Sequence, residues 1–315
     1  MKKIAIIDHV GQKAGMDYYS GSLATGLVQS NCSVTVYSNF SDNNSDTLQY
    51  HSFYDGHTDD NKAIKLFKFI LATLKSSYCA RKYKTELVIL HLFSADFPTL
   101  LLLMIPKFFG LKIAVISHDV SSFIDNDSLF IKQFIYNVLS DHIIVHNKFS
   151  YNELVNSIKL NNAEKVSIIK QGGYIHKIKT HYDKAEARRQ LGLDVNGKYI
   201  LFFGQIKKVK GLDILLKSMS KVPNDIKLVI AGKTWNDSFS KYDDLIKQYN
   251  LDTRVVKKIH FIEDDEREKL FFATDVNVLP YRKIYQSAVL LMAMSYGLPV
   301  ICLLYTSPSP RDPSL

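Results

Sequence analysis

Four short segments place glycine, lysine, serine or histidine directly after an apolar run, where a strand would end and a ligand could bind. The first is the loop from His9 to Met16, which contains Gly15 and leads into a helical pattern. A glycine before a helix lets backbone N–H groups approach a phosphate or a sugar. The same glycine can serve only the turn. The G-x-G-x-x-G fingerprint of dinucleotide sites is absent, which argues against a nicotinamide cofactor.

The second segment is Ser117-His118-Asp119, at the end of the apolar run 112–120. Ligands of open parallel sheets bind at the carboxyl ends of the strands, so His118 is a candidate catalytic residue. A hydrogen-bonded structural histidine explains the pattern equally well. A serine hydrolase triad is excluded, because three adjacent strand residues point to alternate faces and cannot form that relay.

The third segment runs from Gly204 through Gln205 to Asp213 and contains Lys207, Lys208 and Lys210. Three lysines before a helix start are the electrostatic arrangement that a diphosphate needs. A solvated basic loop is the alternative, but the glycines on both sides of the lysines favour close approach of a ligand.

The fourth segment, 279–289, ends with Ser287, Ala288 and Val289 at the start of an apolar helix. The first N–H groups of a helix have no partner within it and can bind a phosphate. The apolar helix that follows is predicted to lie in the core.

The elements that would hold these segments alternate between apolar strands and helices. Strands are predicted at 3–8, 33–38, 86–93, 112–120 and 142–147, and again at 198–204, 226–232, 260–262, 275–280 and 299–301. Continuous apolar strands separated by helices indicate parallel sheets covered on both faces. The pattern pauses near residue 170 and restarts, so we expect two α/β domains, 1–175 and 176–301.

Composition and charge leave several partners open. The 315 residues are 46% hydrophobic, enough for two domains, and three scattered cysteines form no disulfide or metal-binding pattern. No apolar run reaches the roughly 18 residues that cross a bilayer, and no signal peptide is evident, so a cytoplasmic chain is predicted. The charge of +9 fits nucleic acid, an anionic membrane or a phosphorylated ligand. Nucleic acid ranks last, because the lysines lie at strand-to-helix loops and not among stacked aromatics.

The segment 61–84 joins an apolar stripe to seven basic residues. Such a helix can lie on the inner face of an anionic membrane, which would favour a lipid-linked acceptor. An ordinary helix packed on the sheet, with a solvated basic face, is the alternative.

The last residues, 302–315, break the pattern. They contain three prolines in the final eight positions, and CLLYTSPSPRD resembles a translated sequencing adaptor. We therefore expect a non-native tail and a truncated second domain; a native disordered Pro/Ser tail is the alternative.

The strings ILFFGQIKKVKGLDILLKS and RKIYQSAVLLMAMSYGLPVI resemble the second domain of GT-B retaining glycosyltransferases, family 4, also called group 1. This resemblance implies two Rossmann-like domains facing across a cleft. It also implies transfer of a sugar such as a hexose from a nucleoside-diphosphate sugar to a glycan or lipid-linked acceptor. The nucleotide sugar would be a substrate, and neither a cofactor nor a metal is expected.

Carried over by position, the resemblance places the donor at Gly15, Gly204, Gln205, Lys208, Lys210, Ser287, Ala288 and Val289, with His118 beside the transferred sugar. Lys210 and helix N–H groups would stabilise the departing diphosphate. The family's phosphate-binding arginine is Gln205 here, and the glutamates of its E-x7-E motif are Ile284 and Met292. These departures keep open a non-catalytic nucleotide or sugar-phosphate binding protein on the same fold.

Overall fold

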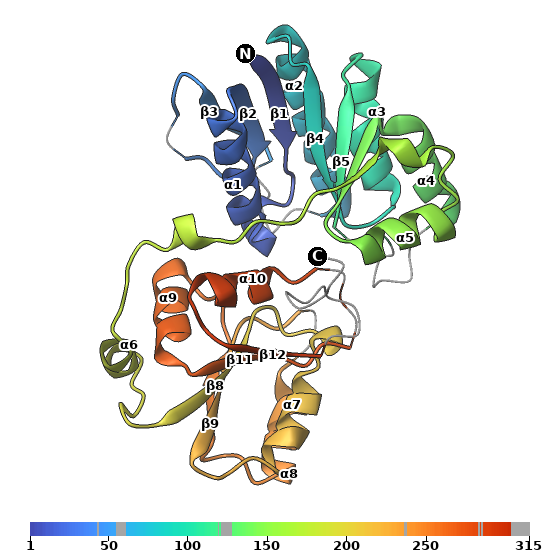
Figure 1. Ribbon diagram of the computed structural model, residues 1–315. Coiled ribbons are helices and arrows are strands. Elements are labelled where there is room, and N and C mark those ends of the chain that lie inside the picture. Colours follow the sequence, from blue (N-terminus) through green and yellow to red (C-terminus); the bar gives the residue numbers. More distant parts are fainter. Residues whose placement is uncertain are drawn as a thin grey trace. The chain divides into compact units, whose positions relative to one another are not determined.

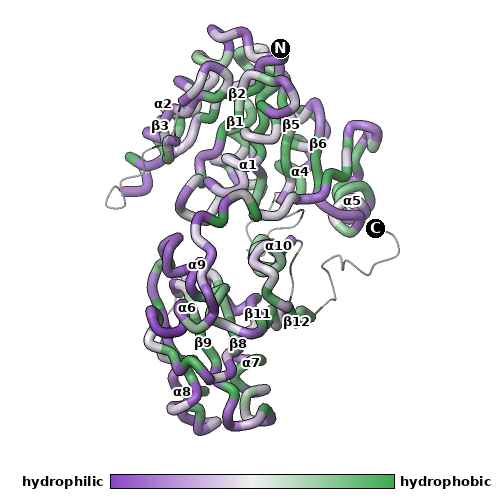
Figure 2. The backbone as a smooth tube through the Cα atoms, turned by 60° about the vertical axis from the view of Figure 1, so that its left-hand side comes forward, coloured by the Kyte–Doolittle hydropathy of each residue, from purple (hydrophilic) through white to green (hydrophobic). Residues whose placement is uncertain are grey.

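The computed structural model describes residues 1–42, 44–54, 61–118, 120, 128–235, 238–282, 284 and 286–303. The chain divides into two compact units, Met1–Gln171 and Gly172–Leu315 (Figure 1). The boundary predicted from the sequence lies four residues later, after residue 175. Figure 2 shows hydrophobic segments in the sheet of each unit.

The first unit is built on a seven-stranded parallel sheet of order β3-β2-β1-β4-β5-β6-β7. Its strands are β1 (Lys2–Ile7), β2 (Cys32–Ser38), β3 (Leu48–Ser52), β4 (Leu87–Leu92), β5 (Ile113–Ser117), β6 (His142–Val145) and β7 (Val166–Ile168). Its α-helices are α1 (Met16–Gln29), α2 (Lys62–Lys82), α3 (Phe97–Phe108), α4 (Leu129–Phe134) and α5 (Lys148–Ser157). Shorter helical turns are η1 (Gly11–Ala14), η2 (Ile135–Leu139, a π-helix) and η3 (Ala163–Lys165).

The second unit is built on a five-stranded parallel sheet of order β10-β9-β8-β11-β12. Its strands are β8 (Lys198–Phe203), β9 (Ile226–Ala231), β10 (Val255–Lys258), β11 (Val276–Leu279) and β12 (Val300–Cys302). Its helices are η4 (Ile175–Lys177), α6 (Lys184–Gln190), η5 (Lys208–Lys210), α7 (Leu212–Met219), α8 (Ser240–Gln248), α9 (Asp264–Ala273) and α10 (Ala288–Ser295).

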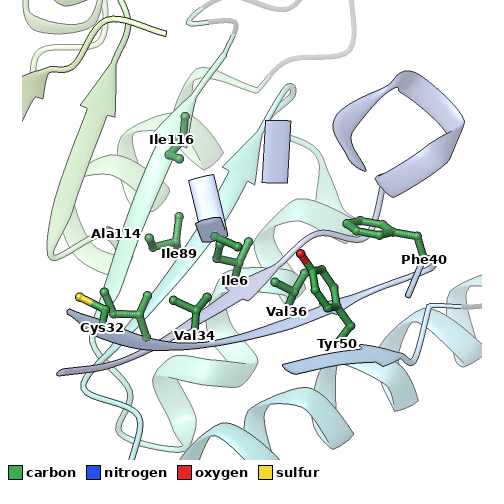
Figure 3. Close-up of a cluster of buried hydrophobic side chains, with 11 residues drawn as sticks. Ile6, Cys32, Val34, Val36, Phe40, Tyr50, Ile89, Ala114 and Ile116 are labelled. Atoms are coloured by element: carbon green, nitrogen blue, oxygen red, sulfur yellow. The ribbon is translucent and has the colours of Figure 1, made fainter. Parts of the chain in front are cut away.

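The core of the first unit explains why these strands form. Figure 3 shows side chains of β1, β2, β4 and β5 stacked on one face of the sheet, among them Ile6, Val34 and Val36, which are 1% exposed or less. Residues of α1, including Ala24, pack against this face. Burying each large aliphatic side chain contributes roughly 1.5 to 3 kcal/mol, so strands with apolar residues on both faces are stable only when helices cover them.

The predicted strand at 260–262 was wrong. The strand is β10 at Val255–Lys258, which lies at the sheet edge and pairs with β9, while Phe261 is 57% exposed in the loop that follows. An edge strand needs less apolar sequence than a central one. The half-polar segment Val-Val-Lys-Lys was therefore not predicted as a strand, and the more apolar loop after it was. The sequence pattern predicts helices near 17–30, 60–83, 97–108, 128–140, 240–250 and 287–296 and one from 211, so it misses α5, α6 and α9. It also misses two further short strands, β3 and β7.

Candidate functional site

A line of polar side chains crosses the carboxyl end of the first sheet. Successive residues of a strand face opposite sides, so residues two apart share a face. The pairs on the face covered by α1 are Ile6 and Asp8, Ile89 and His91, Ile116 and His118, and Ile144 and His146. Because β1, β4, β5 and β6 are consecutive neighbours in the sheet, the apolar core gives way to one carboxylate and three histidines along a single edge.

Aromatic rings hold these histidines, His91, His118 and His146, which we call the histidine cluster. Tyr19 on α1 meets all three, with ring centroids 5.0 to 5.6 Å away, and stands edge-on to His91 and His118. Phe93 stacks on His118 at 4.6 Å with 6° between the ring planes. This packing fixes the orientation of His118 before any ligand arrives.

Hydrogen bonds link Asp8 to His118 through two intermediates. The Asp8 carboxylate accepts from the Val10 and Gly11 amides, at 3.1 and 2.9 Å, and from the Ser20 hydroxyl at 2.6 Å. The Ser20 oxygen is 3.1 Å from Nε2 of His91, and Nδ1 of His91 is 3.0 Å from Nε2 of His118.

This series of hydrogen bonds determines which ring nitrogen of each histidine carries a proton. The single Ser20 proton is donated to Asp8, so Nε2–H of His91 must donate to Ser20. Burial lowers the pKa of His91 to about 4, so the neutral ring leaves Nδ1 as an acceptor for Nε2–H of His118. Burial, with His91 and His146 nearby, holds the pKa of His118 well below its ordinary value. Nδ1 of His118 is therefore a hydrogen-bond acceptor.

His146 follows the same logic. Its Nδ1 lies 2.8 Å from the carbonyl oxygen of Ile169, which can only accept, so Nδ1 carries the proton. Burial lowers the pKa of His146, and the neutral ring accepts the Tyr19 hydroxyl at Nε2, 3.2 Å away. The cluster is neutral at pH 7, and each of these hydrogen bonds has one donor and one acceptor.

In the second unit, glycines bring the ends of β8, β9 and β11 into close contact. A Cβ on Gly211, which has φ +72°, would lie 1.9 Å from the carbonyl oxygen of Pro280, and one on Gly232 would lie 2.0 Å from that of Gly204. A Cβ on Gly204 would lie 3.3 Å from Val289. The loop after β8 therefore packs directly against the segment that follows β11.

Lys210 points into this junction. Its Nζ lies 4.2 Å from the centre of the Tyr281 ring, a cation–π contact. The Tyr281 hydroxyl is 3.0 Å from Oγ of Ser287, and that oxygen accepts from the Leu290 amide at 3.1 Å, which caps α10. A positive charge, a phenol and a helix N-terminus thus follow one another along the carboxyl ends of two adjacent strands.

Arg282 joins the two loops of this site. Its guanidinium forms two bonds with the Asp213 carboxylate, at 2.7 and 2.5 Å, and a third to the Lys208 carbonyl at 2.9 Å. Its backbone N–H donates to the Val209 carbonyl. The Arg282 hydrogen bond holds the pKa of Asp213 below its ordinary value. We call these contacts the Arg282 latch.

The predicted site residues fall in two groups. His118 and Gly15 lie in the first unit, where Gly15 has φ +71° and precedes α1, the helix that carries Tyr19. Gly204, Gln205, Lys208, Lys210, Ser287, Ala288 and Val289 lie in the second unit, along the loop after β8 and the start of α10. Of these, Gly204 meets Val289, and Tyr281 links Lys210 to Ser287. Lys208 and Ala288 are exposed.

The two residues at the positions of the E-x7-E glutamates are apolar, and they also lie in apolar surroundings. Ile284 is 8% exposed and clusters with Leu279 and Tyr281, while Met292 packs against the core of the second unit. The sequence Asp125-Asn126-Asp127, which is more typical of a solvated helix-start loop than of a metal site, lies outside the described residues. Within the described part of the chain, no group of three or more His, Cys, Asp or Glu is placed to hold a metal ion.

Sequence reasoning missed Asp8, Ser20, His91, His146 and Tyr19. Asp8 and His146 had a usable signal, because each ends an apolar strand run, as His118 does, and His91 is the one polar residue near the end of such a run. Ser20 and Tyr19 had none, since their partners depend on how α1 packs on the sheet.

Two parallel-sheet Rossmann-like units in one chain define the GT-B fold of glycosyltransferases. Sucrose-phosphate synthase from Thermosynechococcus elongatus matches 99% of this chain, with 87% of its own chain covered, a TM-score of 0.75 and 18% identity. Anabaena HepE, in complex with UDP-glucose, matches 96% of this chain and 80% of its own, with a TM-score of 0.74 and 18% identity.

At the sequence level, residues 183–309 match the family Glycosyl transferases group 1. Uncharacterized glycosyltransferase MJ1607 from Methanocaldococcus jannaschii is 34% identical over 123 residues, which cover 38% of this chain and 30% of that protein. D-inositol 3-phosphate glycosyltransferase from Mycobacterium sp. (strain KMS) is 27% identical over 167 residues, covering 51% and 37%. The chain spans about a third of the length of these curated relatives. These findings show similarity to group 1 glycosyltransferases over residues 183–309 of the second unit.

Proposed function

We propose that this chain transfers a sugar, a hexose in the simplest case, from a nucleoside-diphosphate sugar to a glycan or lipid-linked acceptor, with retention of anomeric configuration. The observation that carries the proposal is the junction of Lys210, Tyr281 and Ser287 beside Gly204 and Gly211. This junction lies inside the segment that matches the family.

In this proposal the second unit binds the diphosphate. Lys210 supplies a positive charge, and the N-terminus of α10 supplies backbone N–H groups and the positive end of the helix dipole. The Ser287 hydroxyl already caps α10, so the amides of Ala288 and Val289 are the proposed donors. Negative charge grows on the diphosphate as the sugar departs, and these preorganised groups stabilise it more than the ground state.

The first unit contributes a hydrogen-bond acceptor. Nδ1 of His118 would accept a hydrogen bond from a sugar hydroxyl, and the rings of Tyr19 and Phe93 keep the imidazole in place. Because the family's two glutamates are Ile284 and Met292, no carboxylate at these positions grips the sugar or ribose. In the second unit, the proposed donor contacts therefore rest on Lys210 and on backbone amides.

The test measures both binding and transfer. UDP is the first probe, since HepE was solved with UDP-glucose, and GDP, ADP and CMP follow. A nucleotide at about 100 times its Kd should stabilise the chain by about 2.7 kcal/mol, seen as a rise in melting temperature. Lys210→Ala should abolish the shift, whereas Lys217→Ala, an exposed lysine on α7, should leave it unchanged.

Transfer is measured with the nucleotide sugar whose nucleotide binds, against glycan and lipid-linked acceptors. Product of retained configuration supports the proposal. Binding without any transfer would favour a non-catalytic nucleotide-binding protein. A cooperatively folded chain that binds none of the four nucleotides would refute the donor site.

A further inference from the structure

Helix α2 exposes more large apolar side chains than an ordinary surface helix. Its buried residues are all small or hydroxylated: Ala72, Thr73, Ser76, Ser77 and Ala80. The three hydroxyls donate to carbonyls of the helix itself, at 2.8 Å each, so the face toward the protein is compact and its polar groups are satisfied. An amphipathic helix of a globular domain normally turns its large apolar residues inward.

Five large apolar residues of α2 face outward, while Leu66, Phe69 and Ile70 are half-buried and Phe69 contacts the rings of His9 and Tyr54. Ile64, Phe67, Leu71, Leu74 and Tyr78 are 43%, 62%, 48%, 38% and 58% exposed. Their spacing alternates between three and four residues, which places them in one stripe along the helix. Single exposed apolar residues are normal, but a continuous apolar stripe marks an interaction surface.

The charge on α2 indicates what the stripe contacts. Between residues 62 and 82 every charged residue is basic, and Lys68, Lys75 and Lys82 recur at seven-residue intervals, so they form a row beside the stripe. Lys75 also lies over the Phe53 ring, 4.1 Å from its centre. A second copy of the same helix would bring like charges together, which opposes pairing through this face.

We propose that α2 docks the chain on an anionic membrane surface, with the stripe Ile64, Phe67, Leu71, Leu74 and Tyr78 in the headgroup region and the lysine row on the lipid phosphates. The helix is about 30 Å long at 1.5 Å per residue, and a helix of this kind lies in the plane of the interface. No helix of the described residues is long and apolar enough to cross a membrane. The inference stands independently of the proposed glycosyl transfer.

The experiment is sedimentation of the full chain with vesicles of phosphatidylcholine alone and of phosphatidylcholine mixed with phosphatidylglycerol. We expect binding only to the anionic vesicles, weakened by salt. Phe67→Ser should lower the partition coefficient on the order of tenfold, from lost apolar burial. Lys68→Gln and Lys82→Gln should lower it about fivefold each. Phe130→Ser, which removes a 77% exposed phenylalanine on α4, and Lys148→Gln on α5 are the matched controls.

Three results would overturn the inference: no binding to anionic vesicles, equal binding to neutral vesicles, or equal losses in the controls and the α2 variants. A concentration-dependent dimer that Leu71→Asp dissociates would instead assign the stripe to a second copy. Because the substituted side chains are exposed, melting temperatures should not change, and a lowered value would identify a variant that is misfolded.

Discussion

Replacing Ser20 should disturb the protons of the histidine cluster from a distance. Ser20 is fully buried and touches both Asp8 and His91. Ser20→Ala leaves Nε2–H of His91 and one Asp8 oxygen each without that partner, and a buried unsatisfied group costs about 1 to 3 kcal/mol. With two such groups, the variant should lose about 2 to 6 kcal/mol of stability.

The more specific effect is on tautomers. Without the Ser20 oxygen, Nε2 of His91 no longer has to carry the proton, and once Nδ1 does, Nε2 of His118 becomes an acceptor. Long-range 1H–15N NMR of histidine-labelled protein distinguishes protonated from unprotonated ring nitrogens. The unmodified chain should show His118 protonated at Nε2, and Ser20→Ala should show a mixture.

The matched control is Ser22→Ala, on the same helix. Its hydroxyl donates to the Tyr18 carbonyl and not to a group in the series of hydrogen bonds from Asp8 to His118. The NMR signals of His118 should therefore not change. The reasoning is refuted if His118 of the unmodified chain is protonated at Nδ1, if His91 is charged at pH 7, or if Ser20→Ala leaves both rings unaltered.

Three further predictions concern stability. Acid should destabilise the first unit: the histidine cluster has lowered pKa values, so below about pH 6.5 the unfolded chain binds protons that the folded chain does not. For His91, with a pKa of about 4, stability is lost as the pH falls from about 6.5 to about 4, and the loss reaches on the order of 3 kcal/mol. Urea unfolding at pH 7 and pH 5, followed through NMR resonances of the first unit, should show a lower stability at pH 5. Equal stabilities at the two pH values would contradict the prediction. Asn277→Leu should raise the melting temperature, because Asn277 is fully buried and its amide has no hydrogen-bond partner within the described residues; a lowered value would point to a hidden partner. Gly211→Ala should lower stability by more than about 2 kcal/mol, since its Cβ would overlap the Pro280 carbonyl. The control Gly192→Ala, with φ +70° and open space around it, should cost only about 1 kcal/mol. Equal melting temperatures of the two variants would show that the backbone at Pro280 moves away without cost.

Most of the fold could be read from the sequence because buried parallel strands are apolar on both faces. That rule found β1, β2, β4, β5, β6, β8, β9, β11 and β12, and it failed at β3, β7 and β10, which are edge strands that are short or half polar. The π-helical turn at Ile135–Leu139 had no visible signal, since a helix of either type has nearly the same apolar spacing.

The candidate site was only partly accessible. His118 and Lys210 stand next to glycines or strand ends that the sequence displays directly. Ser20 contacts His91, and Tyr281 contacts Lys210; in each pair the partners are 71 residues apart in sequence. Such pairings depend on packing that no local pattern encodes. The same limit applies to α2, whose stripe was visible in the sequence while the side it faces was not.

The Arg282 latch has a thermodynamic consequence. The loop after β8 and the segment after β11 are tied by one guanidinium, so much of their relative motion is already lost in the free protein. A ligand that touches both loops then binds without ordering them, and ordering a side chain or loop costs about 0.5 to 1.5 kcal/mol for each immobilised group. Cutting the latch with Arg282→Ala would therefore make the entropy of nucleotide binding more unfavourable while the contacts made to the ligand stay the same.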